Sequence, residues 1–282
     1  MRLVTFLSAD GQRPGVVDGK EIVDLGAAFE STNALIGGGA QALAAVSEAI
    51  SSGARVPLEG TRLAAPFVPE NIFCVGWNYH KHFEEGAARR GEELPEHPAF
   101  FSKSRTSVIG PYDDIPSHAG VTGQLDWEAE LAVVIGKRGR DLTAGNALEH
   151  VFGYTVANDV SARDLQLRHG GQWIKGKSLD GTCPLGPWIA TRDEIADPQD
   201  VVVYSSVNGV EKQRATTAAM IFPVADLLVR LSEGMTLVPG DVLLTGTPEG
   251  VGMGRDPEEY LTAGAEVVCG VESLGELRNP VS

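Results

Sequence analysis

Three carboxylates at the edges of apolar, strand-like segments could together bind a divalent cation. Glu128 and Glu130 flank Ala129, and Asp159 follows later in the chain. Residues i and i+2 of a strand point to the same face, so Glu128 and Glu130 would project together. Adjacent carboxylates repel unless a positive charge lies between them, and Mg²⁺ accepts oxygen ligands while keeping positions open for water or substrate. The spacing predicts a metal-dependent reaction centre, although Glu-x-Glu is also common on solvated strand faces.

A histidine and a glutamate form a second candidate constellation after the apolar run 72–75. Asn78 is a predicted helix N-cap, and in the helical turn that would follow, His82 and Glu85 share one face. A carboxylate beside an imidazole fixes its tautomer and raises its basicity, so the pair could activate water as a general base. His80 is also available, but no carboxylate is so well placed for it. The alternative is a solvated helix on which His82 and Glu85 are only neighbours.

The composition is that of an ordinary soluble globular protein. The 282 residues are 43% hydrophobic and 22% charged, enough for a sizeable core. The net charge of −15 argues against nucleic acid and anionic membrane surfaces as partners. We see neither a signal peptide nor a membrane-spanning segment, and three distant cysteines predict no disulfide framework. A cytoplasmic location is therefore expected.

The elements that must position these residues are mainly β. Short apolar runs at 3–7, 15–19 and 21–25 predict a small meander, and the periodicity of 41–50 predicts a helix. A proline-bearing connector follows at 56–69. It places the boundary between a small N-terminal α+β domain, 1–66, and a larger domain, 67–282.

The larger domain is predicted to be rich in strands and tight turns. The continuous apolar runs 72–75 and 131–135 are typical of strands buried on both faces. The Asn-Gly pair in 207–210 predicts a two-residue hairpin, and 223–234 predicts a helix that begins at a proline and ends at a glycine. No glycine-rich phosphate loop opens a helix, so a doubly wound nucleotide-binding fold is not expected.

Several polar stretches, each of which is a weak signal by itself, together resemble the fumarylacetoacetate hydrolase family. The resemblance lies in their order and residue identities and extends from about residue 71 to the C-terminus. The matching stretches are 75–79 with His82 and Glu85, 126–131, 153–166, 176–178, 184–188, 207–209 and 239–248. The resemblance implies an α+β, mainly β fold with a mixed β-roll or sandwich catalytic domain, and a homodimer. The stretch 179–181 departs from the family pattern.

The resemblance also implies roles for individual residues. Mg²⁺ or Mn²⁺ would be held by Glu128, Glu130 and Asp159. Lys177 would support an anionic oxygen beside the metal, with His82 and Glu85 as the catalytic dyad. The residues implied to contact substrate are Tyr79, Arg163, Gln166 and Thr247.

The expected activity is hydrolysis of a C–C bond in an acylpyruvate or another 2,4-diketo acid. A 2-keto acid would chelate the metal, which stabilises the enolate formed when the bond breaks. His82 with Glu85 would deprotonate the attacking water. The same logic serves decarboxylation of an oxaloacetate-like acid and isomerisation or hydration of an unsaturated 2-keto acid. A non-catalytic ligand-binding protein on the same fold is a further alternative.

Overall fold

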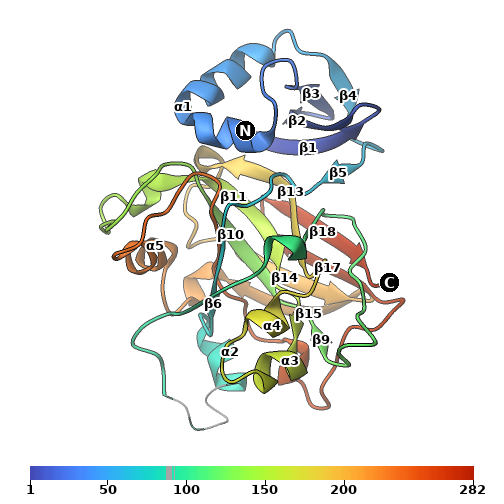
Figure 1. Cartoon of the computed structure of the whole chain (residues 1–282), viewed down its shortest axis with the longest axis vertical. Coiled ribbons are helices and arrows are strands. Elements are labelled where there is room, and N and C mark those ends of the chain that lie inside the picture. The colour runs from blue at the N-terminus through green and yellow to red at the C-terminus, as the bar shows by residue number, and fades with distance from the viewer. Residues whose placement is uncertain (87–90, 92) are drawn as a thin grey trace.

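The chain is built around one large mixed sheet and a smaller antiparallel sheet (Figure 1). This computed structural model describes residues 1–86, 91 and 93–282. Within them, the large sheet runs β4-β3-β2-β1-β13-β11-β10-β16-β6-β7, with β5 paired to β1 and β8 paired to β13. The small sheet runs β15-β14-β17-β18, and β9 pairs with β12. The predicted fold class, α+β and mainly β, is confirmed.

The N-terminal part is a meander covered by one helix. Its elements are β1 (Arg2–Ser8), β2 (Gly11–Asp18), β3 (Glu21–Asp24), α1 (Thr32–Ala49), β4 (Arg55–Pro57) and β5 (Leu63–Ala64). The predicted meander is confirmed, but α1 begins well before the predicted start at 41. Ser31 caps it, and a kink at Gly39, with φ of 54°, interrupts the helix within a glycine run that hides its periodicity. Because β1 pairs with β13, the sheet crosses the boundary placed at residue 66, and that division stays a prediction.

The centre of the large sheet is apolar on both faces. Its strands are β6 (Ile72–Gly76), β7 (Ala99–Ser102), β10 (Ala129–Ile135), β11 (Val151–Asn158), β13 (Cys183–Thr191) and β16 (Val242–Leu244). Every residue of β10 and β11 is buried, and β10 confirms the strand expected from the apolar run 131–135. The run 72–75 forms β6, which is buried except at Phe73 and Gly76. The short strands β8 (Val108–Ile109), β9 (Leu125–Asp126) and β12 (Ser161–Ala162) lie around this core.

The small sheet packs its apolar face against the large one. It consists of β14 (Val202–Val207), β15 (Val210–Thr216), β17 (Glu266–Val271) and β18 (Gly275–Pro280). Asn208 and Gly209, with φ of 51° and 75°, form the predicted hairpin turn between β14 and β15. Val203 and Val267 share one core cluster with residues of β10 and β11.

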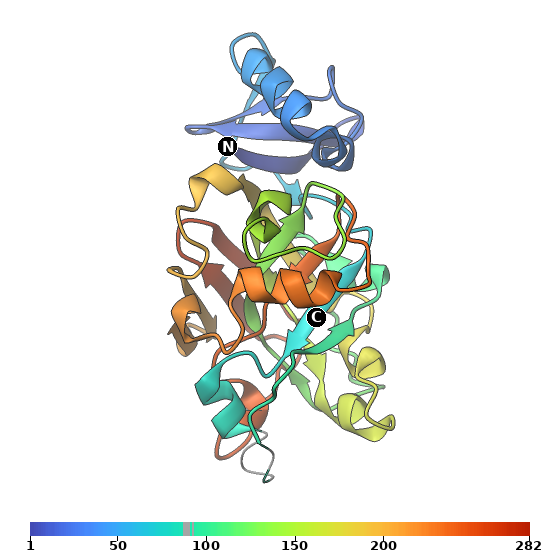
Figure 2. The same ribbon diagram turned by 90° about the vertical axis from the view of Figure 1, so that its left-hand side faces the viewer.

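Helices occupy the flank and the lower end of the larger part (Figures 1 and 2). The predicted helix after Pro223 is confirmed as α5 (Val224–Ser232), and Gly234 follows it with φ of 68°. The short helices α2 (His80–Glu85), α3 (Arg163–Arg168) and α4 (Ile174–Lys177) gather at the end away from the N-terminal meander. None of the helices in the described ranges is long and apolar enough to cross a membrane.

Strand direction brings the candidate residues to one edge of the large sheet. Strand β10 is antiparallel to β11 and β16, and β16 is parallel to β6. The start of β10 therefore lies beside the ends of the other three strands. Ala129 pairs with Asn158, so the residues before β10 and after β11 are neighbours in space although distant in sequence.

Candidate metal centre

The three predicted carboxylates converge at this edge. Glu128 directly precedes β10, Glu130 lies within it and Asp159 follows β11. One oxygen from each lies within 4.8 Å of the others. Their residues are 5%, 1% and 0% exposed, so the alternative of a solvated strand face is wrong. Three converging hard oxygen donors fit a divalent cation such as Mg²⁺ or Mn²⁺.

Buried cations face the carboxylates. Lys177 Nζ lies 2.6 Å from Glu128 Oε2 and 2.9 Å from Asp159 Oδ2. Lys103 Nζ lies 2.8 Å from Asp159 Oδ1, and both side chains are 0% exposed. Lys103 also donates to the carbonyl oxygen of Val160 at 3.1 Å. Two ammonium groups thus neutralise one buried aspartate from opposite oxygens, as buried charges require.

The carboxylates differ in their proton affinity. Burial alone would raise the pKa of Glu128, but the charges of Lys177 and Arg163 outweigh it and lower that pKa to about 2. Burial raises the pKa of Glu130 well above its ordinary value, and the charges of Asp159 and Glu128 add to the rise. Burial would lower the pKa of Lys177, but the charges of Asp159 and Glu128 raise it instead. Of the two glutamates, Glu130 therefore keeps a proton more readily than Glu128.

An arginine anchored by a second acidic residue borders the trio. Arg163 Nε donates to Asp126 Oδ2 at 2.8 Å, and its Nη2 lies 2.7 Å from Glu128 Oε1. Asp126 also accepts hydrogen bonds from the backbone N–H groups of Gly252 and Met253. Gln166 Oε1 accepts from Arg163 Nη1 at 3.1 Å. The guanidinium is thereby held in place, with Gln166 oriented beside it.

The predicted dyad is present. His82 Nδ1 lies 2.9 Å from Glu85 Oε1, and Glu85 accepts hydrogen bonds from the backbone N–H of Gly250. An ionised Glu85 only accepts, so Nδ1 carries the proton and Nε2 can take one. His82 is 5% exposed, whereas His80 is exposed to solvent, so the alternative of a solvated pair is wrong.

The predicted cap at Asn78 is wrong. Tyr79 occupies the N-cap position of α2 and makes no side-chain cap bond. Asn78 instead donates to the carbonyl oxygens of Phe222 and Thr245 and accepts from the N–H of Phe222. A tertiary use of its amide thus overrides the local one, and it ties the end of β6 to the end of β16.

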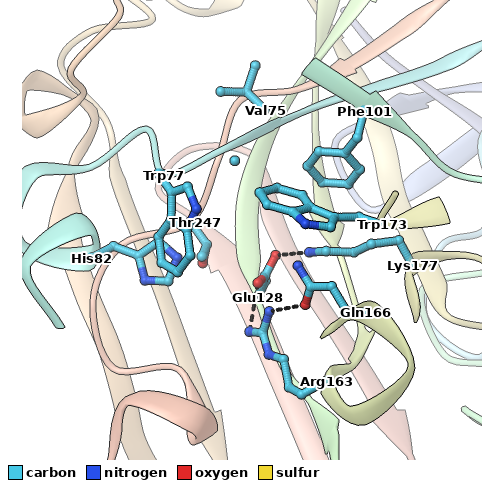
Figure 3. A pocket seen from close by; sticks show the side chains of 11 residues that line it. Val75, Trp77, His82, Phe101, Glu128, Arg163, Gln166, Trp173, Lys177 and Thr247 are labelled. Carbon is cyan, nitrogen blue, oxygen red and sulfur yellow. Dashed lines mark hydrogen bonds and ion pairs between the residues drawn. The ribbon is translucent and has the colours of Figure 1, made fainter. Parts of the chain in front are cut away.

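A pocket opens above these groups (Figure 3). In Figure 3 Glu128 lies between His82 on one side and Lys177 on the other, with Arg163 below. The pocket has about 20 Å³ of space. The residues that line it are Val75, Gly76, Trp77, His82, Phe101, Glu128, Arg163, Gln166, Trp173, Lys177 and Thr247.

Of the residues predicted to contact substrate, Thr247 lines the pocket and Tyr79 does not. Thr247 is in the pocket wall, and its hydroxyl donates to the carbonyl oxygen of Ala129 and accepts from Gln213. Tyr79 is fully buried and is not among the residues that line the pocket. Burial raises the pKa of Tyr79, and the charge of Glu130 adds to the rise. Tyr79 therefore lies in the core beside the acidic trio.

Sequence reasoning missed the aromatic wall and Lys103. Trp77, Phe101 and Trp173 all line the pocket, and the Trp173 ring contacts the other two rings edge to face. Lys177 Nζ lies 5.0 Å from the Phe101 ring centroid. The sequence signal for Lys103 was its position directly after the apolar strand β7.

Comparisons with known proteins agree on one family. The family model described as "Fumarylacetoacetate (FAA) hydrolase C-terminal" matches residues 71–282. The chain is 45% identical over 229 residues to a Rattus norvegicus protein named oxaloacetate tautomerase Fahd2a, mitochondrial, covering 80% of this chain and 71% of that one.

Solved structures give the same result across the whole chain. A fumarylacetoacetate hydrolase from Exiguobacterium antarcticum is 41% identical with a TM-score of 0.88, and the match covers 100% of this chain and 99% of that one. A maleylpyruvate hydrolase from Sphingobium sp. SYK-6, solved with manganese(II) and pyruvate, is 31% identical with a TM-score of 0.82, covering 100% and 98%. The predicted resemblance is confirmed.

Proposed function

The chain belongs to the fumarylacetoacetate hydrolase family, and from this premise we propose that it interconverts the keto and enol forms of a short 2-keto acid. Oxaloacetate is the first substrate to test, because a relative at 45% identity is named an oxaloacetate tautomerase. The observation that carries the proposal is the buried trio of Glu128, Glu130 and Asp159 among fixed cations.

The charge balance of the cluster supports an anionic substrate. Four buried carboxylates, those of the trio and Asp126, face three cations, Lys103, Lys177 and Arg163. The formal charge is −1 with every group ionised and 0 when Glu130 holds a proton. Glu128, Glu130 and Asp159 would hold a divalent cation, which when bound raises the formal charge to +1 and polarises the keto oxygen of the substrate. A carboxylate-bearing substrate is then attracted into a protein whose overall net charge is −15.

The chain's own residues provide the proton transfer. Tautomerisation moves one proton between C3 and the oxygen on C2 and shifts the double bond between C2–O and C2–C3, while every bond between non-hydrogen atoms remains. His82 Nε2 would take or return the proton at C3, since Glu85 holds Nδ1 and stabilises the imidazolium that forms. Lys177 would donate to the substrate oxygen on which negative charge develops. Trp77, Phe101 and Trp173, which line the pocket, would exclude bulk water from it.

Hydrolysis of an acylpyruvate is the second candidate, and the His82–Glu85 pair favours it. A general-base dyad of this geometry could take a proton from water as well as from carbon. Water attack at a second carbonyl would then break the C–C bond and release pyruvate from an acylpyruvate. Decarboxylation of oxaloacetate would use the same substrate as the first candidate but release CO₂.

One experiment separates these reactions. Protein stripped with a chelator is reloaded with Mn²⁺ or Mg²⁺ and mixed with enol-oxaloacetate, and the loss of enol absorbance is followed beside a control of metal without protein. Product analysis by NMR then distinguishes ketonised oxaloacetate from pyruvate, and an acylpyruvate is run in parallel. Acceleration above the metal control without pyruvate supports tautomerisation. Acceleration only with acylpyruvate would replace it by hydrolysis, and no acceleration with either substrate would refute both.

A further inference from the structure

Trp77 has a backbone conformation that bulky residues rarely adopt. It lies between the end of β6 and the start of α2, with φ of 58°. A left-handed conformation at a residue with a large side chain is strained, and it persists where the surroundings hold it. The contacts of the indole show what holds it.

The indole is fixed on three sides. It stacks on the His82 ring, with centroids 4.8 Å apart and an interplanar angle of 29°, and meets Trp173 edge to face at 6.5 Å. On the third side it lies against the backbone of Gly86, where a Cβ atom would come within 2.3 Å of indole Cζ3 and 2.4 Å of Cη2. Glycine at 86 therefore leaves the space that the indole fills.

The indole stands between two cavities. Trp77 and His82 line the inner pocket above Glu128, which has about 20 Å³ of space (Figure 3). The same two residues line an outer cavity of about 250 Å³. The other residues around the outer cavity are Glu85, Gly86, Val251, Met253, Gly254 and Glu258. The inner pocket, beside the reacting groups, is thus far smaller than the space behind the indole.

The two cavities also differ in charge. The inner pocket is lined by two cations, Lys177 and Arg163, and one carboxylate, Glu128, whereas the charged groups of the outer cavity are the carboxylates Glu85 and Glu258. A substrate carboxylate is attracted inward, and a second carboxylate reaching the outer cavity would be repelled. The apolar side chains there, Val251 and Met253, suit an uncharged chain.

We propose that Trp77 limits the substrate to short 2-keto acids by closing the outer cavity off from the inner pocket. The outer cavity is then a site for the uncharged tail of a longer 2-keto acid, reached only when the indole is removed. This inference rests on the proposed function, because it takes the 2-keto carboxylate to bind beside Glu128. Each methylene that enters apolar surroundings strengthens binding by about fourfold, so a tail of several methylenes gives a measurable change.

The test compares three acids on Mn²⁺-loaded protein. The acids are 2-oxobutanoate, which is short, 2-oxooctanoate, which has an uncharged tail, and 2-oxoadipate, which has a second carboxylate. Dissociation constants are measured by calorimetry, and exchange of the C3 hydrogens with deuterium is followed by NMR. The variants are Trp77→Ala and Trp77→Phe, the latter in case the larger cavity prevents folding. Trp188→Phe is the matched control, since Trp188 lines a separate cavity beside the N-terminal meander.

We expect the affinity for 2-oxooctanoate relative to 2-oxobutanoate to rise at least about tenfold in Trp77→Ala and less in Trp77→Phe. The relative affinity for 2-oxoadipate should rise by less, and Trp188→Phe should match the wild type. Unchanged ratios in both Trp77 variants would overturn the inference, as would failure of all three acids to bind. Shifted ratios without C3 exchange in any protein would leave the inference standing and refute the proposed function instead.

Discussion

Replacing Lys103 with methionine tests whether this buried lysine balances the charge of the candidate metal centre. The substitution keeps most of the side-chain volume and removes the ammonium that lies 2.8 Å from Asp159 Oδ1. It also removes the hydrogen bond to the carbonyl oxygen of Val160. Both charged side chains are 0% exposed, so water cannot replace the lost partner without rearrangement.

The expected cost follows from these contacts. Removing one partner of a buried ion pair destabilises a protein by about 3–5 kcal/mol. Asp159 keeps its contact with Lys177 at 2.9 Å, so the lost ion pair should cost the lower end of this range, about 3 kcal/mol. The Val160 carbonyl that loses its hydrogen bond adds about 1 kcal/mol. We therefore expect metal-free Lys103→Met to lose about 4 kcal/mol of unfolding free energy.

Metal should recover part of this loss. A divalent cation held by Asp159 would supply the positive charge that the variant lacks. In the variant the cation is also no longer repelled by the ammonium of Lys103. If it recovers about 1.4 kcal/mol, the variant binds metal about tenfold more tightly than the wild type, because metal affinity and stability are linked.

The assay is urea unfolding with and without Mn²⁺, together with metal titration by calorimetry. Lys175→Met, at an exposed lysine two residues before Lys177, is the matched control and should change stability by less than about 0.5 kcal/mol. A metal-free Lys103→Met protein within about 1 kcal/mol of the wild type would refute the charge-balance reasoning. Metal affinity that falls tenfold would show that Lys103 orients Asp159 as a ligand, which would also contradict it.

Three further predictions concern the dyad, the trio and the strand connection. His82→Ala should lower the catalytic rate by about 10²–10⁴-fold while calorimetry shows nearly unchanged metal affinity, and full retained activity would remove His82 from the mechanism. Because burial raises the pKa of Glu130 in the folded state, its stabilising contribution is present below the unfolded pKa and is lost as pH rises through the folded pKa. Metal-free protein should lose stability across that window and Glu130→Gln should not, while apparent metal affinity in the wild type should rise with pH by up to about tenfold per unit. Asn78→Ala should cost about 2–4 kcal/mol in urea unfolding, since it breaks three buried hydrogen bonds, and a loss below about 1 kcal/mol would contradict that role.

The sequence by itself determined the features that depend on local geometry. The His82–Glu85 pair follows from the spacing of one helical turn, and the hairpin at Asn208 and Gly209 follows from the positive φ angles that these residues tolerate. The continuous apolar composition of 131–135 was enough to predict that β10 is a strand buried on both faces. The acidic trio was a candidate by spacing and composition, with its alternatives still open.

Only the tertiary structure decided which distant residues act on the same groups. Lys103, which follows β7, reaches Asp159, and Asp126 at the end of β9 anchors Arg163, because segments from separate parts of the chain meet around the carboxylates. Asn78 instead pairs with Phe222, which lies just before α5, and with Thr245, which directly follows β16, because the buried carbonyl and N–H groups there need partners. The burial that excludes a solvated Glu128–Glu130 pair likewise comes from packing across the sheets. Local spacing cannot encode these contacts, because their energy depends on segments that meet only after folding.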